Sequence, residues 1–170
     1  GGAALLQEKI VETAADQLVI ITDASKQVKH LGAFALPVEI VKFGCETTQR
    51  LVEHVLADQD VSGKIVTRRG GKYPVETDEG NYILDLQLNY IGSPRTLSSA
   101  LLNIAGVVET GLFLDMTNSI IMGDSNWRAL AKSNDSLSWV ETFYDISIFS
   151  DFLKIKSNVL QVLEHNCTFQ

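Results

Sequence analysis

The sequence predicts an α/β protein in which a helix and a buried strand are followed by a compact α+β unit. Apolar residues recur at helical spacing through residues 5–15, which predicts the helix. The unbroken apolar run at residues 18–21 is typical of a strand buried on both faces of a parallel sheet. From residue 36 to residue 112, candidate strands and helices alternate, with two strands in succession near the middle.

The first helix is expected to begin at an end that a ligand can approach closely. Gly1 and Gly2 carry no side chain, so backbone there can come near a bound group. The unpaired N–H groups of a first helical turn also favour an anion. Glu8 lies about one turn into the helix and is a candidate for proton transfer. The buried face is predicted to consist of Leu6, Ile10, Val11, Ala14 and Ala15.

The strand after this helix ends in polar residues, among them Asp23, Ser25 and Lys26. Open parallel sheets bind ligands at the carboxyl ends of their strands. Glu8 and Lys26, brought together beside a helix N-terminus, are suited to hold a phosphorylated small molecule and to move a proton on it. The alternative is that both are ordinary surface charges, which are common early in helices and after strands.

The α+β unit is predicted from the pattern of its elements. We expect strands at residues 38–43, 64–68, 82–88 and 107–114, and helices at residues 46–57 and from residue 94 to Gly106. Ser93 before Pro94 is typical of a helix start. The first helix of this unit is expected to bury Leu51, Val52, Val55 and Leu56. The order strand, helix, strand, strand, helix, strand is the ferredoxin-like split arrangement.

Composition and charge exclude several classes of function. A net charge of −7 and an isoelectric point near 4.9 argue against nucleic acid or an anionic membrane as partner, because both are bound through basic surfaces. No apolar run reaches the length of a membrane span, and no signal peptide is evident. Cys45 and Cys167 match no metal or redox spacing, which predicts free thiols in a cytoplasmic protein. His30 and His54 are read as surface residues, so no metal site is expected.

Five segments together resemble a known enzyme family. They occur in the order GGAALLQEK at residues 1–9, DASKQV at 23–28, LPVEI at 36–40, TDEGNYILD at 77–85 and GVVETGLF at 106–113. In order and approximate spacing they resemble the signature segments of type A ribose-5-phosphate isomerase, over about residues 1–123. The resemblance implies interconversion of ribose 5-phosphate and ribulose 5-phosphate in the non-oxidative pentose phosphate pathway, without a metal or organic cofactor.

The resemblance also implies roles for individual residues. Glu8 occupies the position of the family's proton-transferring glutamate, although Leu6 and Gln7 replace its usual Thr and Arg. Such a carboxylate moves a proton between C2 and C1 through an enediolate, while fixed donors stabilise the oxyanion. By position, Lys26 is the family's ligand-binding lysine, and Gly1 and Gly2 belong to its substrate-binding loop.

The implied domain organisation has four parts. Residues 1–35 correspond to the C-terminal part of a Rossmann-like catalytic domain, and residues 36–112 to an inserted ferredoxin-like domain commonly used for subunit contact. Residues 113–123 hold a strand, at about 118–122, that returns to the Rossmann-like sheet. Residues 124–170 resemble nothing in the family, and are expected to be either one or two amphipathic helices or foreign sequence from a frame error. A homodimer or homotetramer is expected for the full-length protein.

Several family segments have no counterpart here. The phosphate loop of the TGST kind, the acidic DGADE segment and the lysine before the glycines would all precede residue 1. The chain is therefore expected to be a fragment with an incomplete sheet and little or no isomerase activity alone. Two other functions stay open: a non-catalytic ligand-binding or dimerisation module, and another sugar-phosphate enzyme such as a deaminase or transferase.

Overall fold

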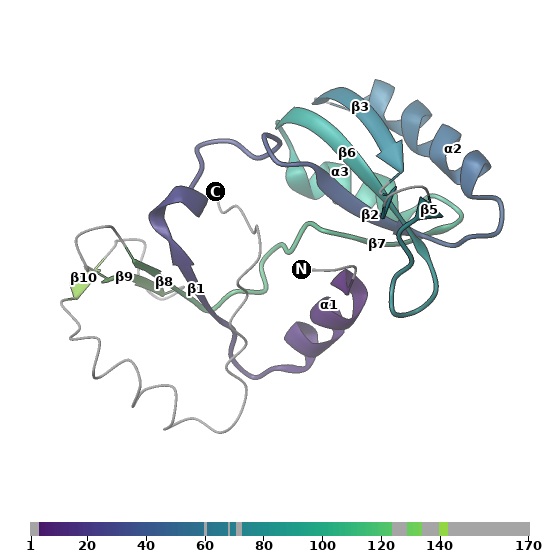
Figure 1. Cartoon of the computed structure of the whole chain (residues 1–170). Helices are drawn as coiled ribbons and strands as arrows, with labels where there is room; N and C mark the ends of the chain where they lie inside the picture. Colours follow the sequence, from purple (N-terminus) through teal and green to yellow (C-terminus); the bar gives the residue numbers. More distant parts are fainter. Residues whose placement is uncertain are drawn as a thin grey trace. The chain divides into compact units, whose positions relative to one another are not determined.

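The computed structural model describes residues 4–59, 61–67, 69–70, 73–123, 129–133 and 140–142 (Figure 1). Its described residues form two compact units, one within residues 1–10 and 28–114 and the other within residues 11–27 and 115–142. Helix α1 (Leu5–Ala14) begins in the first unit and ends in the second. Within the described residues, no helix is long and apolar enough to cross a membrane.

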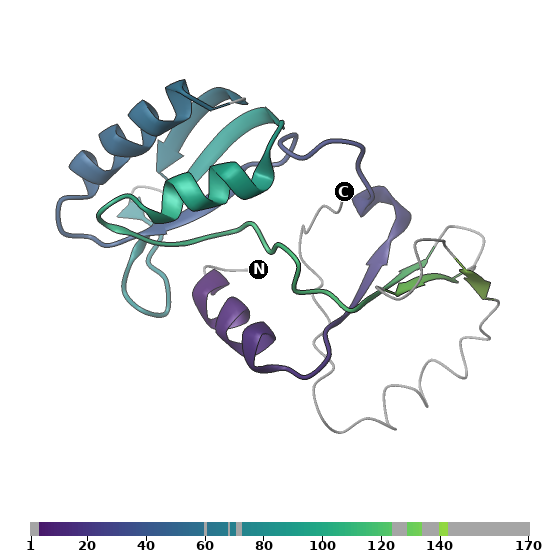
Figure 2. The ribbon, with the colours of Figure 1, turned by 180° about the vertical axis from the view of Figure 1, so that it is seen from behind.

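The first unit is a four-stranded antiparallel sheet covered on one face by two helices. Its strands are β2 (Leu36–Ile40), β3 (Val61–Thr67), β6 (Tyr82–Ile91) and β7 (Val107–Thr110), in the order β3-β6-β2-β7. Helices α2 (Cys45–Ala57) and α3 (Pro94–Leu102) lie in front of the sheet in the view from behind (Figure 2). Two short strands, β4 (Arg69–Gly70) and β5 (Tyr73–Pro74), form a separate pair rather than a continuation of the sheet.

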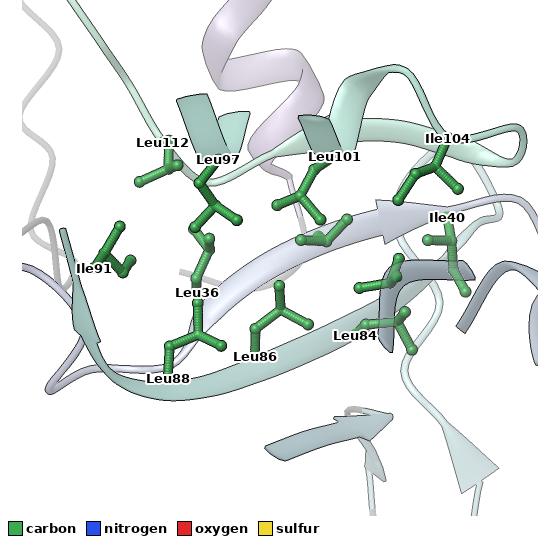
Figure 3. Packing of buried hydrophobic residues seen from close by; sticks show 12 residues of the cluster. Leu36, Ile40, Leu84, Leu86, Leu88, Ile91, Leu97, Leu101, Ile104 and Leu112 are labelled. Atoms are coloured by element: carbon green, nitrogen blue, oxygen red, sulfur yellow. The ribbon is translucent and has the colours of Figure 1, made fainter. Parts of the chain in front are cut away.

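The core of this unit lies between the sheet and its two helices. Successive side chains of a strand point to opposite faces, so alternate residues of β2 and β6 point toward the helices (Figure 3). Leu97 and Leu101 point down onto them from α3, and Val52 packs from α2. The residues of β2 and β6 that alternate toward the helices and are buried there include Leu36, Val38, Ile40, Leu84, Leu86 and Leu88. The intervening residues, including Glu39, therefore lie on the face away from the helices.

The second unit is organised by a parallel pair of strands. Strand β1 (Val19–Asp23) pairs with β8 (Ser119–Gly123), with Val19 opposite Ser119. The Leu18 N–H donates to Asn118 Oδ1 at 2.7 Å, and the Asn118 N–H donates to the Leu18 carbonyl at 2.9 Å, so the register is fixed at the start of the pair. Strand β8 lies within residues 113–123, the segment expected to return to the sheet of the first strand.

Residues 124–170 contain two strands among the residues that are described. Strands β9 (Ala129–Ser133) and β10 (Val140–Thr142) extend the sheet as antiparallel neighbours, in the order β1-β8-β9-β10. These two segments are therefore strands and not part of the one or two amphipathic helices that are one of the two expectations for residues 124–170. The apolar positions at 143–163 that suggested helices lie outside the described residues.

Several element boundaries differ from those the sequence predicts. Strand β2 ends at Ile40 rather than residue 43, because the Lys42 carbonyl accepts the Cys45 N–H in a turn. Helix α3 ends at Leu102, four residues before Gly106. Strand β7 ends at Thr110 rather than residue 114.

The buried face predicted for α1 is wrong. Ile10 is 59% exposed and Val11 46%, whereas Leu5 and Glu12 are buried. Leu5 and Glu12 are seven positions, or about two helical turns, apart, so the buried line of the helix runs through them and not through Ile10 and Val11.

Two further burial predictions are also wrong. Leu51 is 41% exposed, because the buried line of α2 runs through Thr48 and Val52, and the residue beside Val52 is turned about 100° away. Strand β1 is not buried on both faces, since Ile20 is buried but Ile21 is only partly so.

Candidate functional site

Helix α1 carries the predicted proton-transferring residue. Glu8 lies in the first turn of α1, where its side chain is partly exposed and its N–H donates to the Ala4 carbonyl at 2.9 Å. A carboxylate in a first helical turn is favoured by the helix dipole. Gly1 and Gly2, predicted to form the substrate-binding loop, lie outside the described residues.

Lys26 follows strand β1, as the sequence predicts. It is the last residue of a short 3₁₀ helix, η1 (Ala24–Lys26), which begins where β1 ends. Asp23 caps this turn: its Oδ1 accepts the Ser25 N–H at 2.8 Å. Hydrogen bonds from the side chain and backbone of Ser25, and the positive charge of Lys26, lower the pKa of Asp23. Asp23 therefore stays ionised at neutral pH and holds the turn that presents Lys26.

Glu8 and Lys26 belong to different units of the chain. Glu8 lies in the first unit and Lys26 in the second. Their convergence on one ligand stays a prediction. Among the described residues, no group of three or more His, Cys, Asp or Glu side chains is placed to hold a metal ion.

A lysine that the sequence did not single out makes the most extensive polar contacts of α1. The Lys9 ammonium donates to Glu109 Oε1 at 2.6 Å, to the Thr110 carbonyl at 2.7 Å and to the Leu112 carbonyl at 3.1 Å. It also lies 4.9 Å from the centroid of the Phe113 ring, within range of a cation–π interaction. Both side chains of the Lys9–Glu109 pair are only 15% exposed.

These contacts pair backbone groups on the outer edge of strand β7, at and just beyond its last residue. The Gly111 N–H donates to the Pro37 carbonyl of β2 at 2.8 Å, so Gly111 faces β2. Because neighbouring residues of a strand direct their backbone groups to opposite sides, Thr110 and Leu112 face away from the sheet. There the Lys9 ammonium binds both of their carbonyls, and Glu109 Oε1 accepts the Thr110 N–H at 2.7 Å. The edge-facing groups of Thr110 are therefore satisfied by side chains.

A second polar cluster surrounds a fully buried carboxylate on strand β2. Glu39 is 0% exposed, and its Oε1 accepts the Thr77 hydroxyl at 2.8 Å and the Asn81 side-chain amide at 2.9 Å. The Thr77 hydroxyl in turn accepts the Asn81 N–H at 3.0 Å. Glu39 thus holds together the turn at residues 77–81. Its Oε2 has no hydrogen-bond partner among the described residues.

The two clusters lie on the same face of the sheet. Glu39 stands opposite Glu109 in the β2–β7 register, and residues directly opposite each other in a strand pair share a face. Their members come from four of the five sequence segments that resemble the isomerase family. The shared segments therefore meet in one polar band on the face away from α2 and α3.

The Glu39 cluster gives a stability prediction. We expect Glu39→Ala to lower the free energy of unfolding by about 1–3 kcal/mol, because the side chains of Thr77 and Asn81 then lose a buried acceptor. We expect Glu39→Gln to cost less, since its amide oxygen still accepts both bonds. Urea unfolding of the two variants measures the difference. Equal losses would show that the charge of Glu39, not its acceptor oxygen, is what the turn requires.

Comparison with known proteins identifies the family. The family model for ribose 5-phosphate isomerase A (phosphoriboisomerase A) matches residues 1–126. Ribose-5-phosphate isomerase A of Cereibacter sphaeroides strain KD131 is 51% identical over 156 residues, covering 89% of this chain and 60% of that protein. The Dinoroseobacter shibae protein of the same name is 53% identical over 156 residues, with the same coverage.

Solved structures agree with the sequence matches. A ribose 5-phosphate isomerase from Plasmodium falciparum superposes with a TM-score of 0.71 at 28% identity, covering 78% of this chain and 57% of that one. Ribose 5 phosphate isomerase A from Neisseria gonorrhoeae gives a TM-score of 0.66 at 35% identity, covering 78% and 55%. The α/β architecture, with one parallel strand pair and an antiparallel sheet, is thus shared with enzymes of this class. The chain belongs to the ribose 5-phosphate isomerase A family.

The extent of the matches bears on the last part of the chain. The chain spans about 60% of the length of the two curated relatives. The family model ends at residue 126, close to where the resemblance was expected to stop. The alignments with these relatives nevertheless cover 89% of the 170 residues, which is more than residues 1–126 supply. Part of the segment 124–170 therefore aligns with them, which argues against a wholly foreign tail.

Proposed function

We propose that these residues belong to an isomerase that interconverts ribose 5-phosphate and ribulose 5-phosphate in the non-oxidative branch of the pentose phosphate pathway. The observation that carries the proposal is the family match over residues 1–126, which includes both Glu8 and Lys26. The Cereibacter sphaeroides relative of the same name supports it at 51% identity. The sugar phosphate is accordingly the proposed partner, and the cytoplasm the proposed location.

The proposed mechanism assigns the proton transfer to Glu8. In the open-chain sugar, the Glu8 carboxylate removes the proton from C2 to give an enediolate and returns it to C1. Positioned donors are required for the negative charge that develops on oxygen during this transfer. Lys26 is proposed to supply a positive charge to the phosphate or to a sugar oxygen, and Gly1 and Gly2 to bring backbone close to the substrate.

We propose a Rossmann-like unit, represented by residues 1–35 and 113–123, with residues 36–112 inserted as a ferredoxin-like domain. The antiparallel order β3-β6-β2-β7 with both helices on one face supports the second assignment, and the parallel pairing of β1 with β8 supports the first. A homodimer or homotetramer is proposed for the complete enzyme.

A chimeric enzyme tests the proposed activity directly. Residues 1–123 of this chain would replace the matching segment of the Cereibacter sphaeroides relative, and the conversion of ribose 5-phosphate to ribulose 5-phosphate would be followed by NMR. We expect the chimera to catalyse the conversion. The 170-residue chain, which spans 60% of that relative, is expected to be much slower. A folded chimera that binds the sugar phosphate without turnover, or that converts only another phosphosugar, would contradict the proposal.

A further inference from the structure

We propose that Lys9 is a positioning residue for catalysis: it anchors the first turns of α1 to the edge of β7 and so holds the neighbouring Glu8 in place. This inference rests on the proposed isomerase function. The contacts that carry it lie within the first unit, because Lys9 and residues 109–113 both belong to it.

The anchoring is unusually complete for one side chain. A lysine ammonium has three N–H donors, and the acceptors in place are one carboxylate oxygen and two backbone carbonyls. Charge-assisted hydrogen bonds of this kind are about twice as strong as neutral ones. The two carbonyls belong to the backbone at the end of β7, which no change of side-chain rotamer can displace. Lys9 is therefore tied to the sheet itself as well as to Glu109.

The position of Lys9 on the helix connects this anchor to Glu8. Consecutive helical residues are about 100° apart around the axis and about 1.5 Å apart along it. A large rotation of the helix about its axis, or a large shift along it, would therefore break the bonds of the Lys9 ammonium. Proton transfer requires the catalytic carboxylate within hydrogen-bond reach of the reacting carbon's proton, and a displacement of about 1 Å can lower a rate a hundredfold.

The same unit contains a second lysine–glutamate pair, whose members lie outside α1. Lys42 pairs with Glu76 at 2.6 Å and lies 5.4 Å from the centroid of the Tyr82 ring, so its charge, distance and aromatic neighbour resemble those of Lys9. Its side chain is 38% exposed and that of Glu76 58%, compared with 15% for both members of the Lys9 pair. Lys42→Met therefore controls for the loss of a lysine charge.

The first experiment measures the anchor itself and needs no turnover. Hydrogen exchange of the α1 amides would be followed in the 170-residue chain and in its Lys9→Met, Lys9→Arg and Lys42→Met variants. We expect Lys9→Met to accelerate exchange by about tenfold or more, since the helix loses its attachment to β7. Lys9→Arg should retain most of the protection, and Lys42→Met all of it. Unchanged exchange in Lys9→Met would overturn the proposal.

The second experiment measures the catalytic consequence in the chimera. We expect Lys9→Met to lower kcat by about ten- to a hundredfold with KM changed by less than about twofold, because the substrate still binds while the carboxylate is misplaced. Lys9→Arg should restore most of kcat, and Lys42→Met should leave it unchanged. If Lys9→Met does not fold, Glu109→Gln is used in its place. The amide oxygen of Gln can still accept hydrogen bonds, but the negative charge that pairs with the Lys9 ammonium is lost.

The outcomes separate the positioning role from the proposed activity. Faster exchange with an unchanged kcat would overturn the role of Lys9 in catalysis and leave the isomerase assignment intact. An unmodified chimera without isomerase activity would remove the proposed function, and with it the catalytic role of Lys9. In that case the exchange data would still show whether Lys9 anchors α1. Faster exchange together with a kcat that Lys9→Arg restores would support the proposal.

Discussion

Glu8→Gln in the chimera is expected to lower kcat for ribose 5-phosphate by about a hundred- to ten-thousandfold, the range that a general base contributes. Glutamine has nearly the same shape as glutamate and still accepts a hydrogen bond, but its amide cannot take up the proton from C2. Because substrate binding does not depend on that proton transfer, KM should change far less than kcat. Initial rates over a range of ribose 5-phosphate concentrations measure the two constants separately.

Glu46→Gln is the matched control for this substitution. Glu46 also lies in the first turn of a helix, α2, and its side chain is exposed. The same change of charge at an equivalent helical position should therefore leave kcat unaltered. A Glu8→Gln chimera that retains a tenth or more of the kcat would show that another group moves the proton, and the assignment of Glu8 would then be wrong.

Gly32→Ala is expected to lower the free energy of unfolding by about 2–5 kcal/mol, the sum of backbone strain and forced overpacking. Gly32 has a φ of +118°, which residues with a side chain rarely adopt. A Cβ at this position would stand 2.5 Å from the backbone N and 2.7 Å from the Cα of Tyr90. Backbone atoms of β6 cannot move aside as a flexible side chain does. Urea or thermal unfolding of the variant measures the loss.

Two other glycines separate the causes of this loss. Gly80 also has a positive φ, +76°, but a Cβ there would meet nothing within 4 Å, so Gly80→Ala should show the backbone strain alone. Gly123 has neither feature, and Gly123→Ala should cost little. If Gly32→Ala is no more destabilising than Gly80→Ala, the close approach of residue 32 to the backbone of β6 does not contribute to the stability loss.

The repeating patterns of the sequence predicted the longer helices and strands up to residue 123 but not their ends, and they did not predict β9 or β10. In β6, leucines at every second position predict one core-facing side, and Leu84, Leu86 and Leu88 are buried. Ile83 is also fully buried, although it lies on the opposite face. The end of β2 is set by a turn of four residues, in which the Lys42 carbonyl accepts the Cys45 N–H. The backbone at and beyond the end of β7 binds the Lys9 ammonium, about 100 positions away, and no local spacing of residues reveals that contact.

The candidate site was predicted only where a helix or strand end implied it. Glu8 and Lys26 lie on the elements expected to carry them, a first helical turn and the end of a parallel strand. Lys9 and Glu109 were missed because they are 100 positions apart in the chain. One local signal was available for Glu39: a charged residue within an otherwise apolar strand, LPVEI, requires partners if that position is buried.

The long separations within each unit determine when it can assemble during synthesis. The Lys9–Glu109 bond joins residues 100 apart, and Val19 pairs with Ser119 across the same interval. During synthesis, the partners of α1 and β1 emerge only after roughly a hundred further residues have been added. Contacts between such distant segments slow folding, because a long loop must close before they form. The helix that carries Glu8 is thus made about a hundred residues before the segment that anchors it.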